Sequence, residues 1–249
     1  MTIATTPERD VAYEHLDKPR IKYSMVNSVD YAGHMDVLGS IPKAYRKAVY
    51  GQCQTMEYKR GQSLWHQGDS AESVGFLITG KAMSTYLSPA GKTGITGFWS
   101  DGDILGAADL GGFPTRQMTV RFLETSTIST MPIVKFYDTL ERFPEMGRQV
   151  VRALSVRLRW VAHLALTLET QSAEDRIKSV LIILVERFGV TIETGQRIDL
   201  KLTNEELGAM VGVSRQMTNG VLNKLKNSGC ITLERRWITI TDFDSLKPS

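Results

Sequence analysis

The stretch TNEELGAMVGVSRQMTNGVLNKLK, which occupies residues 203–226, predicts two short helices joined by a tight turn. Thr203 and Glu206 have the spacing of a capping box, in which each side chain accepts a hydrogen bond from the other residue's backbone N–H. Gly212 should end the first helix, and Ser214 should cap the second. Apolar residues at helical spacing predict one buried face on each helix, formed by Leu207, Met210 and Val211 in the first and by Met217, Val221, Leu222 and Leu225 in the second.

This pattern is typical of a helix-turn-helix, whose second helix lies in the major groove of DNA. Polar side chains that could reach bases or phosphates lie at the start of each helix and along the exposed side of the second. The candidate DNA-binding residues in this stretch are Thr203, Ser214, Arg215, Gln216, Asn219, Asn223 and Lys224. The same two helices could instead belong to an ordinary all-α core, so the motif alone leaves that alternative open.

The residues that follow the motif predict a wing. Two short strands within residues 231–241 flank a basic turn, and this turn adds Arg235 and Arg236 to the candidate DNA-binding residues. Between Val211 and Thr241, Glu234 is the only acidic residue, whereas the chain has five basic residues there: Arg215, Lys224, Lys226, Arg235 and Arg236. Such a local excess of positive charge fits a DNA-facing surface, although a solvated surface can show the same cluster.

A longer helical pattern precedes the motif and predicts a dimerisation helix at residues 144–171. Its apolar residues recur in steps of three and four, which is the a/d pattern of a coiled coil over about three heptads. The predicted dimer interface comprises Val151, Leu154, Leu158, Val161, Ala165 and Leu168. A core helix of a single subunit is the alternative, but no other predicted helix of similar length offers a partner strip. The segment Ser172–Asp175 should cap the next helix, which Gly189 should end.

Residues 56–132 show a different pattern, in which short apolar or alternating runs are separated by glycine turns. Short strands at this spacing predict an antiparallel sandwich or roll. The whole chain therefore reads as an α+β protein with four parts. These are an N-terminal extension at 1–30, an effector-sensing β-roll at 31–143, the dimerisation helix at 144–171 and a winged helix-turn-helix domain at 172–249.

Composition limits the class of protein. The chain has 249 residues, of which 42% are apolar and 23% are charged, as in ordinary globular proteins. No apolar run approaches the ~18 residues that span a bilayer, and no export signal appears, so we expect a cytoplasmic protein with no membrane partner. Cys53 and Cys230 are far apart, which argues against a disulfide framework, a structural zinc site and a four-cysteine iron–sulfur cluster.

The order of these parts resembles the cAMP receptor protein/FNR (Crp/Fnr) family of bacterial transcription regulators over about residues 35–245. The segments 64–69, 76–80 and 102–106 resemble the glycine-marked turns of the family's roll, which is a jelly roll of the cyclic-nucleotide-binding type. Residues 203–215 resemble its DNA-binding signature, and residues 229–233 and 238–240 resemble its wing. The resemblance implies a homodimer that binds double-stranded DNA at a palindromic operator, with RNA polymerase as a partner.

The chain departs from the cAMP-binding members of that family. Ala107 follows Gly106 where those members have the glutamate that holds the ribose, and Gln117 replaces the serine beside the arginine that matches Arg116. Val161 and Ala162 stand for the threonine–serine pair that faces the purine. We therefore expect no cAMP response but control by another small effector, or no effector at all. The predicted pocket residues, which could equally be ordinary packing, are Gly106, Ala107, Ala108, Arg116, Val161 and Leu164.

Haem sensing and enzymatic activity are the remaining alternatives. The histidines that could ligate haem are His15, His34, His66 and His163, although a structural or exposed role suits each of them better. A cupin-type metal centre needs several histidines inside the roll, whereas His66 is the only one between Met56 and Pro132. No nucleophile motif, P-loop or dinucleotide glycine pattern appears either. The sequence therefore predicts a regulator without a metal centre or an assigned cofactor, and not an enzyme.

The DNA-reading residues differ from the family's usual Arg, Glu and Arg. Arg215 matches the first of these, Gln216 replaces the glutamate, and Gly220 replaces the second arginine. Glutamine favours adenine, and Asn219 could partly substitute for the lost arginine. We expect an operator half-site that differs from the one that cAMP receptor proteins bind.

Overall fold

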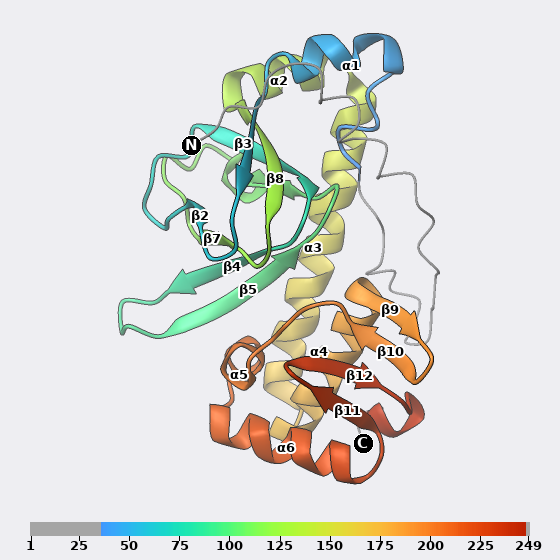
Figure 1. Ribbon diagram of the computed structural model, residues 1–249. Coiled ribbons are helices and arrows are strands. Elements are labelled where there is room, and N and C mark those ends of the chain that lie inside the picture. Colours follow the sequence, from blue (N-terminus) through green and yellow to red (C-terminus); the bar gives the residue numbers. More distant parts are fainter. Residues whose placement is uncertain (1–35, 248–249) are drawn as a thin grey trace. The chain divides into compact units, whose positions relative to one another are not determined.

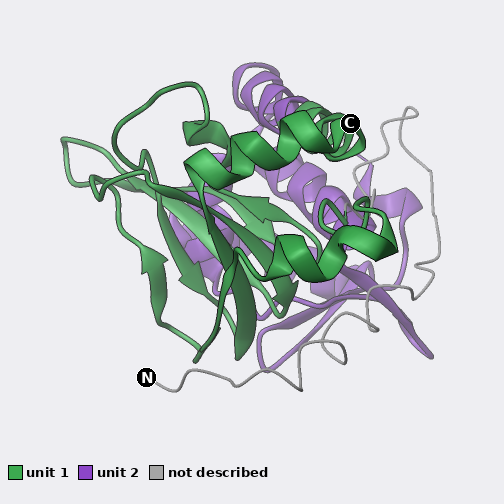
Figure 2. Cartoon of the chain, turned by 90° about the horizontal axis from the view of Figure 1, so that it is seen from above, with its two compact units in different colours: residues 1–20, 34–157 green, residues 21–33, 158–249 purple. Residues whose placement is uncertain are grey.

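The protein is described by a computed structural model that covers residues 36–247, and its chain divides into two compact units (Figures 1 and 2). Within the described range, the first unit contains residues 36–157 and the second contains residues 158–247. The extension predicted at residues 1–30 lies outside the described residues, as do His15 and His34.

The first unit is built around two four-stranded antiparallel sheets (Figure 1). One sheet has the order β1-β8-β3-β6, and the other has the order β2-β7-β4-β5. The strands are β1 (Gln54–Tyr58), β2 (Ser63–Trp65), β3 (Ser73–Thr79), β4 (Ala82–Leu87), β5 (Thr93–Trp99), β6 (Ile104–Leu105), β7 (Thr119–Phe122) and β8 (Ser126–Pro132). The predicted antiparallel roll is confirmed, since the strands fall on the apolar runs and turns between them contain Gly61, Gly68, Gly80, Gly91 and Gly102.

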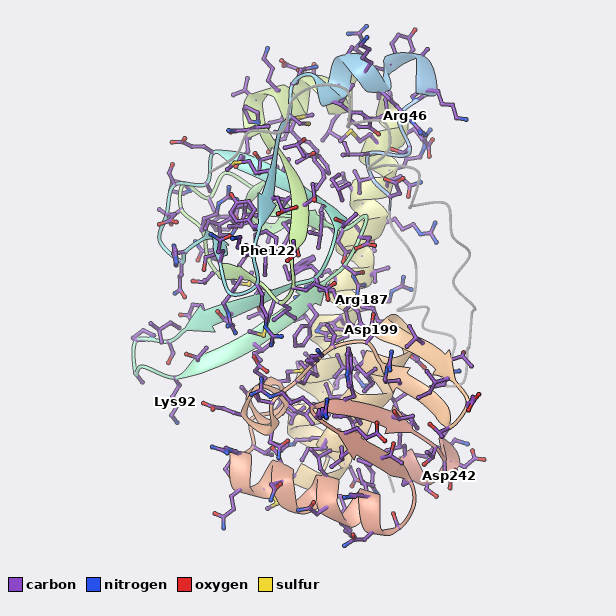
Figure 3. All side chains as sticks on the ribbon, in the orientation of Figure 1. Arg46, Lys92, Phe122, Arg187, Asp199 and Asp242 are labelled. Carbon is purple, nitrogen blue, oxygen red and sulfur yellow. The ribbon has the colours of Figure 1, made fainter. Side chains whose placement is uncertain are left out.

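The roll has an apolar interior. Phe122, which Figure 3 labels, is fully buried and stacks on Tyr58 with 4.7 Å between the ring centroids. Leu77 and Ile128 from the opposite sheet are also fully buried and belong to the same cluster. Burial of such side chains contributes about 1.5–3 kcal/mol each, so this cluster holds the two sheets together.

A second cluster joins the roll to three helices: α1 (Lys43–Tyr50), α2 (Ile133–Arg142) and the first half of α3 (Pro144–Thr170). Phe76 of β3 and Phe136 of α2 meet there, and Val150, Ala153 and Val156 bring α3 into it. A short 3₁₀ helix, Ala107–Asp109, follows β6. Helix α2 was not predicted from the sequence.

The division between the two units falls inside α3, after Arg157, and not at the helix break near residue 172. Arg157 explains this position, because its guanidinium group lies 4.5 Å from the ring centroid of Trp99 and donates to the carbonyl of Thr96. Gly97 leaves room for the arginine, since a Cβ there would collide with the guanidinium. The first half of α3 is thus packed on the roll.

The second unit combines three helices with one four-stranded antiparallel sheet of order β11-β12-β10-β9. Its helices are α4 (Ala173–Phe188), α5 (Asn204–Val211) and α6 (Arg215–Asn227), with a short 3₁₀ helix at Asp244–Leu246. The strands are β9 (Gly189–Ile192), β10 (Gly195–Ile198), β11 (Ile231–Glu234) and β12 (Trp237–Ile240). Figure 1 shows α5, α6 and this sheet around α4, which is the largely buried helix of the unit. The sequence analysis missed the β9–β10 hairpin.

Within residues 36–247, no helix combines the length and the apolar character that crossing a bilayer requires.

Candidate nucleic-acid interface

The first helix of the predicted motif begins at a complete capping box. The hydroxyl of Thr203 accepts from the backbone N–H of Glu206 at 3.0 Å, and the carboxylate of Glu206 accepts from the backbone N–H of Thr203 at 2.8 Å. Two backbone donors that the helix itself cannot satisfy are therefore paired. The prediction for this helix start is confirmed, and it fixes the position of Asn204, the first residue of α5.

The turn between α5 and α6 depends on two glycines. Gly212 has φ +66°, a left-handed conformation that glycine adopts at little cost and other residues rarely adopt. Gly208 faces the turn, and a Cβ on it would lie 2.6 Å from the carbonyl oxygen of Val213 and 2.7 Å from Oγ1 of Thr218. The absence of a side chain at Gly208 therefore lets α5 and α6 approach closely, which sets their relative position.

Ser214 caps α6, as predicted, with its hydroxyl accepting from the backbone N–H of Met217 at 3.2 Å. The prediction that Met217 belongs to the buried face is wrong, because its side chain is 49% exposed. Thr218 takes the inward position and is fully buried, with its hydroxyl donating to the carbonyl of Ser214 at 3.0 Å. The buried face of α6 continues through Val221, Leu222 and Leu225.

The opposite face of α6 presents polar side chains to solvent. Arg215, Asn219 and Asn223 are exposed and follow each other at intervals of four residues, so they line one side of the helix. Gln216 is exposed beside them. This face carries amide and guanidinium groups, which match the donors and acceptors on base edges in a major groove.

Lys224 is also exposed, but it is already paired in the DNA-free chain. Its Nζ lies 2.7 Å and 2.9 Å from the two carboxylate oxygens of Glu174, at the start of α4. Glu174 also forms an ion pair with Lys178, whose Nζ lies 3.3 Å from Oε1 of the glutamate. The hydrogen bond from Lys224, more than any other contact, holds the pKa of the Glu174 carboxyl below its ordinary value. The expected phosphate contact of Lys224 must therefore compete with this carboxylate.

The wing is a tight hairpin of β11 and β12 whose turn consists of Arg235 and Arg236. Both residues have positive φ, 45° and 79°, where asparagine and glycine are usual in two-residue hairpin turns. Both side chains are exposed, so the tip of the wing carries two adjacent positive charges. At its base, Trp237 contacts Arg197 and Lys201, whose charged groups lie 4.7 Å and 5.1 Å from its ring centroid.

Comparison with known proteins agrees with this geometry. A model of the Crp-like helix-turn-helix domain matches residues 175–248, and a model of the cyclic nucleotide-binding domain matches residues 55–143. The chain belongs to the Crp/Fnr family. It is a transcription regulator with a DNA-binding helix-turn-helix, and the family consists of regulators rather than enzymes.

Relatives in the Crp/Fnr family align over most of the chain. The transcriptional activator protein anr of Pseudomonas aeruginosa is 27% identical over 185 residues, which cover 74% of this chain and 75% of that protein. The fumarate and nitrate reduction regulatory protein of Escherichia coli K12 is 26% identical over 188 residues, which cover 76% of this chain and 75% of that protein.

Solved structures share the fold. A c-di-GMP-responsive regulator named CLP, from Xanthomonas campestris, superposes with a TM-score of 0.70 at 19% identity, covering 80% of this chain and 99% of its own. A mutant of CooA from Carboxydothermus hydrogenoformans superposes with a TM-score of 0.71 at 20% identity, covering 86% of this chain and 94% of its own. These similarities establish the arrangement of the elements and not the ligand.

Arg116, one of the residues predicted to line an effector pocket, is only 2% exposed. Its Nη1 lies 3.0 Å from Oδ2 of Asp109, and its Nη2 donates to the carbonyl oxygen of Ser73 at 2.6 Å. Its guanidinium group lies 3.7 Å from the ring centroid of Trp65. Gly106 has φ +78°, and a Cβ there would come within 2.7 Å of Nη1 of Arg116. The guanidinium group that was expected to contact a ligand is thus already paired with other residues of the roll.

One atom of this cluster stays unsatisfied. Nε of Arg116 is buried and has no hydrogen-bond acceptor within the described residues. Ala107 is buried beside the cluster, whereas Ala108 is exposed. Val161, which is 49% exposed, and Leu164, which is half-buried, belong to the second unit. The structure therefore brings together Gly106, Ala107 and Arg116 from the predicted set.

The residues for other cofactors are distributed as follows. Cys53 and Cys230 are both buried, and they belong to different units. Since the chain has only two cysteines, its residues do not fit a four-cysteine iron–sulfur cluster. His66 is exposed and His163 is half-buried. Within residues 36–247, no three His, Cys, Asp or Glu side chains are grouped so that they could hold a metal ion.

Proposed function

We propose that the chain binds a two-fold symmetric DNA operator as a homodimer, with one α6 helix in the major groove of each half-site. The exposed face of α6 carries this proposal, because Arg215, Gln216, Asn219 and Asn223 are presented together on a helix whose caps and turn are rigidly built. The basic tip of the wing supports the same orientation, since Arg235 and Arg236 belong to the adjacent hairpin.

Each candidate residue has a role that follows from its chemistry. Arg215 suits bidentate contacts with guanine O6 and N7, and Gln216 suits adenine N6 and N7. Asn219 and Asn223 supply further donors to base edges. The remaining candidates suit phosphate oxygens, which position the protein without reading sequence; they are Thr203, Ser214, Lys224, Arg235 and Arg236.

The second element of the proposal is the dimer interface along α3. The strip that was predicted from the heptad pattern is solvent-exposed in the single chain, as Val151 is 64%, Leu158 is 70% and Val161 is 49% exposed. Leu154 and Leu168 are 39% and 40% exposed, and Ala165 is also exposed. Such a continuous apolar strip on a long helix favours a second copy of the same helix as its partner.

The proposed control is a small effector other than cAMP, and two features of Arg116 support it. Asp109 already neutralises the guanidinium group, so a cyclic phosphate would have to displace a buried carboxylate. The orphaned Nε–H costs about 1–3 kcal/mol while it has no acceptor, and an effector that brings an acceptor would recover that energy. The same internal ion pair favours a second candidate function, a regulator of this fold that needs no effector.

A haem-dependent gas sensor is the remaining alternative, with His163 or His66 as the haem ligand. A visible absorption spectrum of the purified protein tests it, because bound haem absorbs visible light. The activator names of the relatives support RNA polymerase as a partner, and the DNA-binding helix-turn-helix domain supports a cytoplasmic location.

The dimer and its DNA binding are tested together with Val151→Glu/Leu158→Glu. Sedimentation should change from dimer to monomer, and operator affinity should fall at least tenfold, because burying two carboxylates in an apolar seam is unfavourable. Arg152→Glu, on the neighbouring exposed side of α3, is the control and should stay dimeric. A double variant that remains dimeric with unchanged affinity contradicts the proposed interface. DNA binding that rises with micromolar cAMP contradicts the proposed control.

A further inference from the structure

We propose that Asn204 of α5 determines which bases Asn219 of α6 can read, by holding the Asn219 amide so that it presents hydrogen-bond donors to the DNA. This inference rests on the proposed function, in which α6 lies in the major groove. It assigns a specificity role to a residue that does not itself belong to the reading helix.

The geometry is a single hydrogen bond between the two helices of the motif. Nδ2 of Asn204 donates to Oδ1 of Asn219 at 3.1 Å. Asn219 lies one turn beyond Arg215 on the exposed face of α6, so its amide is beside the arginine that is proposed to contact guanine.

Both ends of this hydrogen bond are held by rigid neighbours. Asn204 follows directly on Thr203, whose capping box fixes the start of α5. The close approach of Gly208 to Thr218 sets the spacing of the two helices, and Thr218 is the residue next to Asn219. A buried threonine and a capped helix end therefore keep the two amides within reach of each other.

The hydrogen bond changes what Asn219 can offer to a base. A free carboxamide has one oxygen acceptor and two N–H donors, and it pairs with adenine by accepting from N6 and donating to N7. In this chain the oxygen points toward Asn204, which leaves the NH₂ group directed away from α5. Asn219 is then suited to bases that need only a donor from it, which are guanine through O6 and N7 and thymine through O4, whereas at adenine a donation to N7 would leave the N6 amino group without an acceptor from Asn219.

Substitutions at position 204 reverse or remove this constraint. Asn204→Asp has no donor, so its carboxylate accepts from the NH₂ of Asn219 and turns the amide oxygen toward the DNA. The preferred base then becomes one with an amino group, adenine or cytosine. Asn204→Ala leaves the amide free and should broaden the preference. Asn227→Asp, at the end of α6, adds the same charge and is the matched control.

The experiment is selection of bound duplexes from random DNA by the full-length chain and by these variants. For the wild type we expect guanine or thymine at the half-site position that Asn219→Ala makes indifferent. Asn204→Asp should change that position alone to adenine or cytosine, with the preference ratio shifted by about tenfold or more. Asn227→Asp should leave the selected site unchanged.

Thermal unfolding of each variant separates specificity from folding. Asn204→Asp places an acid in the first turn of α5, where the helix dipole favours it, so we expect a folded protein. The inference is wrong if the wild type selects adenine at this position, or if Asn204→Asp and Asn204→Ala select the wild-type site. A wild-type chain that enriches no sequence overturns the proposed function and this inference with it, whereas an Arg215-dependent site insensitive to residue 204 overturns the inference alone.

Discussion

Arg116 and Asp109 form a buried ion pair inside the roll, with Nη1 of the arginine 3.0 Å from Oδ2 of the aspartate and side chains that are only 2% and 6% exposed. Ser73 and Trp65 complete the surroundings of the guanidinium group. The partners come from three different parts of the roll, so the pair ties its β-strands to the 3₁₀ helix that holds Asp109.

Removing one member of this pair should destabilise the protein strongly. Asp109→Ala leaves a buried guanidinium group without its countercharge, for which we expect a loss of about 3–5 kcal/mol in the free energy of unfolding, measured with urea. Asp109→Ala/Arg116→Met removes both charges and should regain most of that stability. If the single variant is as stable as the wild type, the ion pair has no structural role.

The two arginines at the wing tip should lower the stability of the fold and strengthen its binding to DNA. Arg235 and Arg236 occupy left-handed conformations that strain non-glycine residues by about 1–3 kcal/mol each. Arg235→Asn/Arg236→Gly should therefore raise the free energy of unfolding, while losing up to two phosphate contacts. Each lost contact lowers the slope of log affinity against log salt by about 0.9.

Lys92→Gln is the control for the wing, since this exposed lysine lies in the β4–β5 turn of the other unit (Figure 3). It should change neither stability nor the salt slope. Equal salt slopes for the wing variant and the wild type, measured by fluorescence anisotropy, exclude the wing tip from the DNA contact.

Glu174 should weaken DNA binding through its ion pair with Lys224. Glu174→Gln removes the carboxylate that competes with phosphate for Lys224, so affinity at low salt should rise several-fold and the salt slope should steepen by about one phosphate contact. Glu193→Gln, in the turn between β9 and β10, removes an exposed carboxylate that pairs with no lysine among residues 36–247, and it is the control. An equal effect of both variants would indicate a general charge effect.

Acid should destabilise the fold through His163. Burial lowers the pKa of its imidazole below the ordinary value of 6.5, so the unfolded chain takes up a proton at higher pH than the folded chain. This contribution to stability is present above pH 6.5 and is lost as the pH falls through the lower, folded pKa. His163→Gln should reduce the loss of unfolding free energy that accompanies falling pH. His66→Gln, which changes an exposed histidine, should leave that loss unchanged. Identical declines in all three proteins contradict this assignment.

The sequence predicted most of the DNA-binding motif because its signals are local. The caps at Thr203, Ser172 and Ser214 need only residues three positions away, and the structure contains all three. Met217 was misplaced because it lies next to the buried stripe, and the hydroxyl of Thr218 can be buried only because Ser214 accepts its hydrogen bond.

The contacts that we expect to influence effector control and DNA binding join residues far apart in the chain. Arg116 meets Ser73, Lys224 meets Glu174, and no local pattern predicts either pair. The β9–β10 hairpin was missed for a similar reason, since its short strands are partly polar and β10 is stabilised by pairing with β12.

The most direct test of the account is selection of DNA by the wild-type chain and by Arg215→Ala, followed by measurement of the affinities of the selected duplexes. We predict two half-sites related by two-fold symmetry, with centres about one helical turn apart, and a guanine in each half-site whose preference Arg215→Ala relaxes at a cost of about 1–3 kcal/mol. Recovery of the half-site that cAMP receptor proteins bind, or of a single asymmetric site that is insensitive to Arg215→Ala, would contradict it.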